Sequence, residues 1–232
     1  MAKLFDKPNS ETDVTFLFED ESTLDAHRFI LCCTSSLFRR IFLSHSELSS
    51  LHAERPKSKI EGKLTSKDIN ANRVPGLVKV SSDRGVPYDC VHFEESQRIF
   101  LTLRKEISRQ TMIQVLRYMY TGELDLPDWE SFEEKHLAAV VDVAKTFQVE
   151  TLVDLLTNED ISTYDYVDEW KNEFIALNKC LFCHTSRFSD VTFHVEKQMV
   201  SAHTSILMSR CDVMAAMLSG NFRERRQSEV RS

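Results

Sequence analysis

The sequence predicts an α+β fold, and three features of the chain indicate it. Short segments rich in β-branched and aromatic residues alternate with longer segments in which apolar residues recur every three or four positions. Stretches of polar residues, glycine and proline separate them. The third feature is a duplication, because residues 13–42 and 190–218 carry nearly the same pattern. Both segments open with Asp-Val-Thr-Phe and continue to an Ala-His pair, whose histidines are His27 and His203.

The length of the repeat indicates whole domains. Equivalent residues stand about 176 positions apart, far more than a solenoid period and close to the size of a small domain. We therefore expect a first domain over residues 1–170, followed by a linker and the N-terminal part of a second domain over 171–232. Because the chain has 232 residues, we expect the second copy to stop before the strand and helices that complete the first. A fragment and an alternatively ended product both fit this pattern.

Composition and charge argue against several classes of partner. The chain is 42% hydrophobic and 28% charged, which is typical of a globular protein. No stretch approaches the roughly 18–20 uninterrupted apolar residues of a membrane span, and the first residues lack the apolar core of a secretory signal. A net charge of -7 opposes binding to nucleic acid, because phosphate recognition needs concentrated Lys and Arg. We therefore expect a cytoplasmic protein that binds neither membrane nor nucleic acid.

The first elements are a hairpin and two short helices. Residues 14–18 are β-branched and aromatic, which predicts a largely buried strand, and the polar residues 19–22 supply the turn after it. From Leu24 to Phe42 the apolar residues recur at three- and four-residue steps. The Thr-Ser-Ser at 34–36 interrupts that period, so we expect two helices with a break there.

A long polar insertion follows. Between about residues 46 and 89 the periodicity disappears and Ser, Lys, Arg, Asn, Gly and Pro dominate. A surface insertion of this length is tolerated because the entropy of loop closure grows only slowly with length. The domain then resumes, since 99–103 reads as a strand and 111–122 as an amphipathic helix that Gly122 ends.

The first domain closes with a further pair of helices between Leu137 and Leu156, with Phe147 at the corner between them. The acidic and aromatic stretch 158–174 is either a linker or a short docking helix. We place the boundary between the domains near residue 170.

These segments carry a resemblance to a known family. The motifs DVTF, DAHRFIL, SSLFRRIF, VLRYMYTGEL and AAVVDVAKTFQVETLVDLL follow one another in the order of a BTB (POZ) domain. The resemblance implies a short β-sheet flanked by a cluster of helices, here with a long inserted loop and an incomplete second copy. Two BTB domains in tandem, the first split by an insertion, resemble the RhoBTB family of atypical Rho GTPases. No Gly-x4-Gly-Lys-Ser/Thr loop is present, so we expect no nucleotide to bind.

The resemblance also implies a function. BTB domains are adaptors that associate with themselves or with other BTB proteins, and many dock the N-terminal helices of a cullin, which brings a ubiquitin ligase to a substrate. The family's docking motif is a hydrophobic residue, any residue and then glutamate, just after the third helix. Phe222 and Glu224 stand at that place in the second copy, and Phe93 and Glu95 follow the insertion in the first.

Two other readings stay open. In a scaffold, homo- or hetero-oligomerisation through the BTB domains is the whole function, and Phe222 closes the core of its own domain. Exposure of Phe222 with Glu224 favours cullin docking, and burial favours the scaffold. In a truncated product without function, the helices that would cover the second copy are missing. Its apolar side chains are then left exposed as an aggregation hazard, namely Met214, Met217, Leu218 and Phe222.

A charged pair is the second candidate feature of the site. Asp13 and Arg28 match the family's pair at the surface where BTB domains dimerise. The second copy keeps Asp190 but has Thr204 in place of the basic residue, which argues against an equivalent pair there. The pair can be structural as well as associative, because a buried charge that loses its partner destabilises the fold.

No catalytic, cofactor or metal site is expected. The chain lacks a G-x-S-x-G elbow and an H-E-x-x-H pair. CLFCH at 180–184 matches the attachment motif for c-type haem and half of a zinc site, but haem attachment requires export and zinc requires four convergent ligands. We expect His27 and His203 to be hydrogen-bonded core histidines. The cysteines are expected to be buried free thiols, among them Cys32, Cys33 and Cys211.

Overall fold

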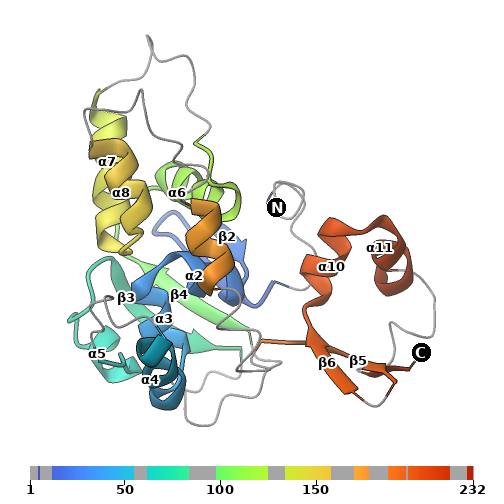
Figure 1. Cartoon of the computed structure of the whole chain (residues 1–232). Helices are drawn as coiled ribbons and strands as arrows, with labels where there is room; N and C mark the ends of the chain where they lie inside the picture. Colours follow the sequence, from blue (N-terminus) through green and yellow to red (C-terminus); the bar gives the residue numbers. More distant parts are fainter. Residues whose placement is uncertain are drawn as a thin grey trace.

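The computed structural model describes residues 5, 12–54, 62–83, 98–124, 134–157, 170–177, 188–196, 198–219 and 229–231. The first copy forms a mixed sheet covered by helices, drawn from blue to yellow in Figure 1. The second copy, in orange and red, lies to one side of it and has its own small sheet. The predicted α+β class is confirmed.

Four strands form the first sheet, in the order β2-β1-β4-β3. They are β1 (Val14–Leu17), β2 (Thr23–Ala26), β3 (Leu77–Ser82) and β4 (Ile99–Leu103). The predicted hairpin is present, because β1 pairs with β2 in antiparallel register. β1 also pairs with β4, but in parallel, so a crossover that includes the insertion joins these two central strands.

Helices cover this sheet, and local signals set their ends. They are α2 (Arg28–Thr34), α3 (Ser36–Phe42), α6 (Arg109–Thr121), α7 (Glu134–Thr146) and α8 (Glu150–Thr157). The predicted break between α2 and α3 falls at Ser35, whose extended backbone ends one helix while its Oγ accepts from the Phe38 N–H and so caps the next. Gly122 ends α6 with a left-handed φ of 74°.

The inserted range contains three elements that the sequence did not predict. α4 (His45–Glu54), α5 (Ser66–Asn70) and β3 all lie within or at the edge of residues 46–89. α5 begins with a capping box in which the Thr65 and Asp68 side chains each accept from the other's backbone N–H. β3 shows no clean alternation because its register with β4 shifts between Leu77 and Lys79. The elements are too short or too irregular for a periodic signal.

The core of the first copy is built from aromatic and aliphatic side chains of the strands and of the helices. Phe38 lies at its centre, in ring contact with Phe16, Phe42 and Phe147. Phe147 is fully buried at the corner between α7 and α8, as predicted. Residues 170–177 are helical, and their Trp170 and Phe174 belong to this same core. Of the stretch 158–174, the structure describes residues 170–174, and these belong to a helix that packs on the core, as in the docking-helix alternative.

The second copy repeats the first in outline. β5 (Val191–Val195) pairs with β6 (Gln198–Ala202) in an antiparallel hairpin and with β7 (Glu229–Arg231) in parallel. The expectation that the copy stops before this strand is therefore wrong. Three residues at the end of the chain are too few to show a period, and only their pairing with β5 reveals them.

Two further expectations for the second copy need correction. Its helices are α10 (Thr204–Arg210) and α11 (Asp212–Ser219). Cys211 is exposed, because it is the extended residue that ends α10, whereas Cys32 and Cys33 are buried as predicted. On α11, Leu218 is buried, Met214 and Met217 are half-buried, and Val213 and Ala216 are exposed. Leu218 is therefore not among the side chains left uncovered.

Candidate interaction site

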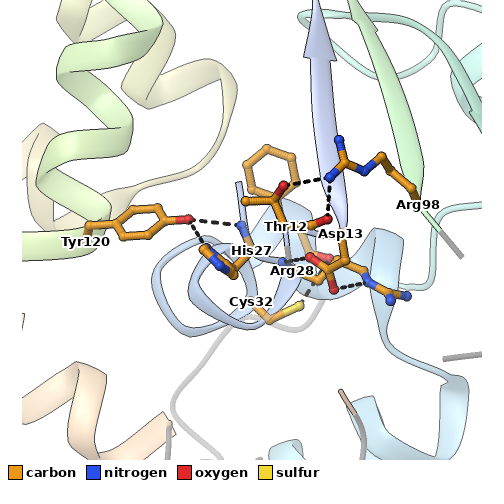
Figure 2. Close-up of polar contacts among 8 residues, drawn as sticks. Thr12, Asp13, His27, Arg28, Cys32, Arg98 and Tyr120 are labelled. Carbon is orange, nitrogen blue, oxygen red and sulfur yellow. Dashed lines mark hydrogen bonds and ion pairs between the residues drawn. The ribbon is translucent and has the colours of Figure 1, made fainter. Parts of the chain in front are cut away.

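An ion pair joins the start of β1 to the start of α2. The Asp13 carboxylate accepts two hydrogen bonds from Arg28, one from the backbone N–H at 2.7 Å and one from Nε at 2.6 Å (Figure 2). The Arg28 side chain is only 3% exposed, and that of Asp13 is 26% exposed. The carboxylate therefore neutralises a buried guanidinium and also caps a helix N-terminus. The structure brings the two predicted residues together, and their role between BTB copies stays a prediction.

The second copy keeps half of this arrangement. The Asp190 carboxylate accepts from the backbone N–H of Thr204 at 2.7 Å, in the place where Asp13 accepts from the backbone of Arg28. Thr204 carries no charge, so the second copy retains the helix cap without an ion pair. The sequence comparison of the two copies had indicated this difference.

A buried histidine ties α6 to the start of α2. The Tyr120 hydroxyl lies 2.9 Å from the backbone N–H of His27, which donates to it, and 2.7 Å from Nδ1 of the same residue (Figure 2). Burial lowers the pKa of His27, although the nearby Asp13, Asp190 and Asp25 oppose it, and burial raises the pKa of Tyr120. The imidazole and the phenol are thus both neutral near pH 7. The predicted hydrogen-bonded core histidine is confirmed for His27.

Arg98 binds the segment that precedes β1. Its Nη2 donates to the backbone carbonyl and the Oγ1 of Thr12, both at 2.9 Å (Figure 2). Its Nη1 lies 3.4 Å from the Asp25 carboxylate. Thr15 donates to the same carboxylate at 2.6 Å. One guanidinium at the start of β4 thereby ties together the segment before β1 and the edge strand β2. Sequence reasoning missed Arg98 and Tyr120, because each lies more than seventy residues from its partners.

The two copies meet at this site. The His203 ring, at the start of α10, lies 4.7 Å from the Phe29 ring of α2 at an interplanar angle of 30°. The Arg28 guanidinium lies 5.2 Å from the centre of the Phe188 ring, within the range of a cation–π interaction. Phe29 also contacts Phe174 edge to face. The face around the N-terminus of α2 therefore holds the linker helix and the second copy together.

We expect the stability of this region to fall below about pH 6.5. Burial lowers the pKa of both His27 and His203 from their ordinary value of 6.5. The unfolded chain therefore binds more protons than the folded chain as the pH drops through 6.5, and the free energy of unfolding decreases in that window. Urea unfolding between pH 5 and 8 measures it. His27→Gln/His203→Gln should flatten the slope, and exposed His45→Gln should keep it. An equal slope in the double variant would contradict the assignment.

The four cullin-docking candidates, Phe222, Glu224, Phe93 and Glu95, lie outside the described residues, as does the CLFCH motif at 180–184. Within the described part of the chain, no three His, Cys, Asp or Glu side chains stand together as metal ligands. No helix in the described ranges has the length and apolar character to cross a membrane.

Comparison with known proteins agrees with the architecture. The BTB/POZ domain matches residues 2–80, 90–163 and 179–232. Rho-related BTB domain-containing protein 1 from Homo sapiens is 26% identical over 277 residues, covering 99% of this chain and 39% of that protein. Rho-related BTB domain-containing protein 2 from Homo sapiens is 35% identical over 118 residues, which cover 50% of this chain and 16% of that protein. Rho-related BTB domain-containing protein 3 from Homo sapiens is 23% identical over 213 residues, which cover 88% of this chain and 31% of that protein.

The chain thus spans about two fifths or less of the length of these relatives. The three matched segments cover most of the chain, and the last of them falls on the second copy. Both copies share the hairpin, a later strand that pairs in parallel with the first strand, and a carboxylate that caps the helix after the hairpin. The chain belongs to the BTB/POZ domain family.

Proposed function

We propose that the chain is a protein-interaction adaptor that recruits a cullin-RING ubiquitin ligase through its BTB domains. Membership of the BTB/POZ family and similarity to Rho-related BTB domain-containing proteins support an adaptor role. The proposal that a cullin binds is supported by one observation: the two Phe-x-Glu motifs occupy equivalent positions in the sequence relative to the strands of their copies. Each motif precedes the strand that pairs in parallel with the first strand of its copy.

The strand registers make this comparison quantitative. In the first copy Thr15 pairs with Phe100, and in the second copy the equivalent Thr192 pairs with Glu229. Phe93 stands seven residues before Phe100, and Phe222 stands seven residues before Glu229. The spacing is the same although the first copy carries the insertion ahead of its motif and only two residues separate α11 from Phe222. The equal spacing supports an equivalent role for the Phe-x-Glu motif in the two copies.

The chemistry of the motif suits docking on a helical partner. A phenylalanine fills an apolar pocket as an anchor, and a carboxylate two residues on pairs with donors at the rim of the contact. Of the two motifs, we favour Phe222 with Glu224, since only two residues separate it from the end of α11 in the sequence.

Calorimetric titration with a purified N-terminal domain of the third cullin tests the proposal. We expect the unaltered chain to bind, and Phe222→Ala/Glu224→Ala to weaken binding by about 30-fold or more, because an anchor residue contributes roughly 2 kcal/mol or more. Phe93→Ala/Glu95→Ala reports on the first copy. Exposed Val213→Ala on the neighbouring helix is the matched control and should bind normally. Absence of heat from a chain shown to be folded by circular dichroism would overturn the cullin proposal.

A scaffold built on association between BTB copies is the second candidate function. The packing of His203 on Phe29 favours it, because this is a contact of one copy with the other. The same titration separates the two functions, since a scaffold gives no heat with the cullin domain whichever motif is altered.

A further inference from the structure

The N-terminal end of α2 is covered by residues of the second copy. Phe188 lies against the Arg28 guanidinium, and His203 lies against the Phe29 ring. Ile206 of α10 and Phe188 both pack against the core cluster of the first copy. Arg28 and Phe29 are almost fully buried as a result of their packing with these and other neighbours. The contact is apolar and aromatic at its centre, as at a specific interface.

Phe188 has a backbone that also indicates a built contact. Its φ is 66°, in the left-handed region that bulky residues rarely adopt. Such a conformation is strained and persists only where the surroundings hold it. The Arg28 guanidinium over its ring is one interaction that does so.

Equivalent positions of the two copies lie at this contact. His203 occupies in the second copy the position of His27 in the first, at the N-cap of the equivalent helix, and both imidazoles are buried. Burial lowers the pKa of each, and the carboxylates of both copies, Asp13 and Asp190, oppose it for both histidines. In the first turn of α10, Thr204 and Ser205 are buried, as Arg28 and Phe29 are in the first turn of α2. The contact thus involves the same end of the equivalent helix in each copy.

We propose that the two BTB copies of one chain dock on each other through the same face, the N-terminal ends of α2 and α10, and that this intrachain contact keeps the face from pairing with a second chain. A face that accepts a homologous copy is already shaped to accept a second copy of itself. If the second copy is displaced, the aromatic surface around Phe29 becomes exposed to solvent. The same face of a second chain then binds to it.

His203→Asp is a suitable variant to open the contact. His203 is the N-cap of α10 and makes no capping bond with its side chain, whereas aspartate is a favoured N-cap, so the helix itself is preserved. The new carboxylate stands against the Phe29 ring and repels Asp13. Phe188→Ala is a second variant that adds no charge. Val213→Asp, on the exposed side of α11, is the matched control for the change in charge.

Sedimentation velocity over a concentration series and hydrogen exchange of the first-turn amides of α2 give the readout. We expect the unaltered chain and Val213→Asp to sediment as one chain of 26.9 kDa. His203→Asp and Phe188→Ala should shift toward twice that mass as concentration rises. In dilute solution their α2 amides should exchange at least about 10-fold faster, because the local cover is lost.

Two results would overturn the inference. A dimer of the unaltered chain in dilute solution would show that the contact does not occupy the pairing face. Unchanged mass and unchanged α2 exchange in both His203→Asp and Phe188→Ala would show that the copies do not dock this way. The inference does not rest on cullin binding, and titrating the same variants with the cullin domain reports on that proposal separately.

Discussion

Asp13→Ala is expected to lower the free energy of unfolding of the first copy by about 3 kcal/mol. Removing the carboxylate takes away the charge that Asp13 supplies to the Arg28 guanidinium, and only 3% of the Arg28 side chain is exposed. Breaking a buried ion pair from one side costs roughly 3–5 kcal/mol, and the lower end applies because the Asp13 side chain is a quarter exposed. The N-terminus of α2 also loses an acceptor. Native-state hydrogen exchange of the α2 amides measures the effect.

The duplication supplies the control for this experiment. Asp190→Ala removes the same helix cap in the second copy but no ion pair, so we expect a loss of only about 0.5–1 kcal/mol in the exchange of the α10 amides. Asp13→Asn keeps an oxygen acceptor and loses the charge, and should fall between the two. Equal losses for Asp13→Ala and Asp190→Ala would mean that the ion pair with Arg28 adds nothing to the cap.

Gly122→Ala is expected to destabilise the first copy by about 2–5 kcal/mol. The residue adopts φ of 74°, which costs an L-residue roughly 1–2 kcal/mol. An added Cβ would stand 2.7 Å from the Trp170 ring, an overlap that costs a further 1–3 kcal/mol or so in a packed core. The clash should loosen the helix at 170–177 from α6. Urea unfolding gives the free energy.

Tryptophan emission locates that loss. With Trp129 replaced by Phe, the fluorescence reports on Trp170 alone, and we expect a red shift in Gly122→Ala before global unfolding. Gly62→Ala is the control, since a Cβ there meets no atom within 4 Å. An unshifted spectrum together with unchanged stability would mean that Trp170 does not pack on Gly122.

What the sequence predicted correctly depends on signals within a few residues. The β1–β2 hairpin follows from a β-branched run and a polar turn, the break at Ser35 from a capping residue, and the end of α6 from Gly122. Phe147 could be placed at its corner because apolar periods flank it on both sides. Each of these features is fixed by local backbone preference, which the sequence carries directly.

What it did not predict depends on contacts between distant segments. β3 and β7 are strands because β4 and β5 offer them partners, and neither shows a pattern by itself. Tyr120 could be placed on a helix, but its bond to His27 could not be foreseen. The packing of the second copy on Phe29 likewise depends on tertiary contacts between distant segments. Only the Asp13–Arg28 pair was found in advance, and a family resemblance suggested it.

The parallel pairing of β1 with β4 has a consequence for how the chain folds. Thr15 and Phe100 are 85 residues apart, whereas Thr192 and Glu229, which pair in the same way, are 37 apart. The extra length raises the entropic cost of closing the loop by only about 0.7 kcal/mol, so insertions of varied length leave the native register undisturbed. Long-range contacts nevertheless slow folding. The sheet of the second copy should therefore close before that of the first, although the first is synthesised earlier.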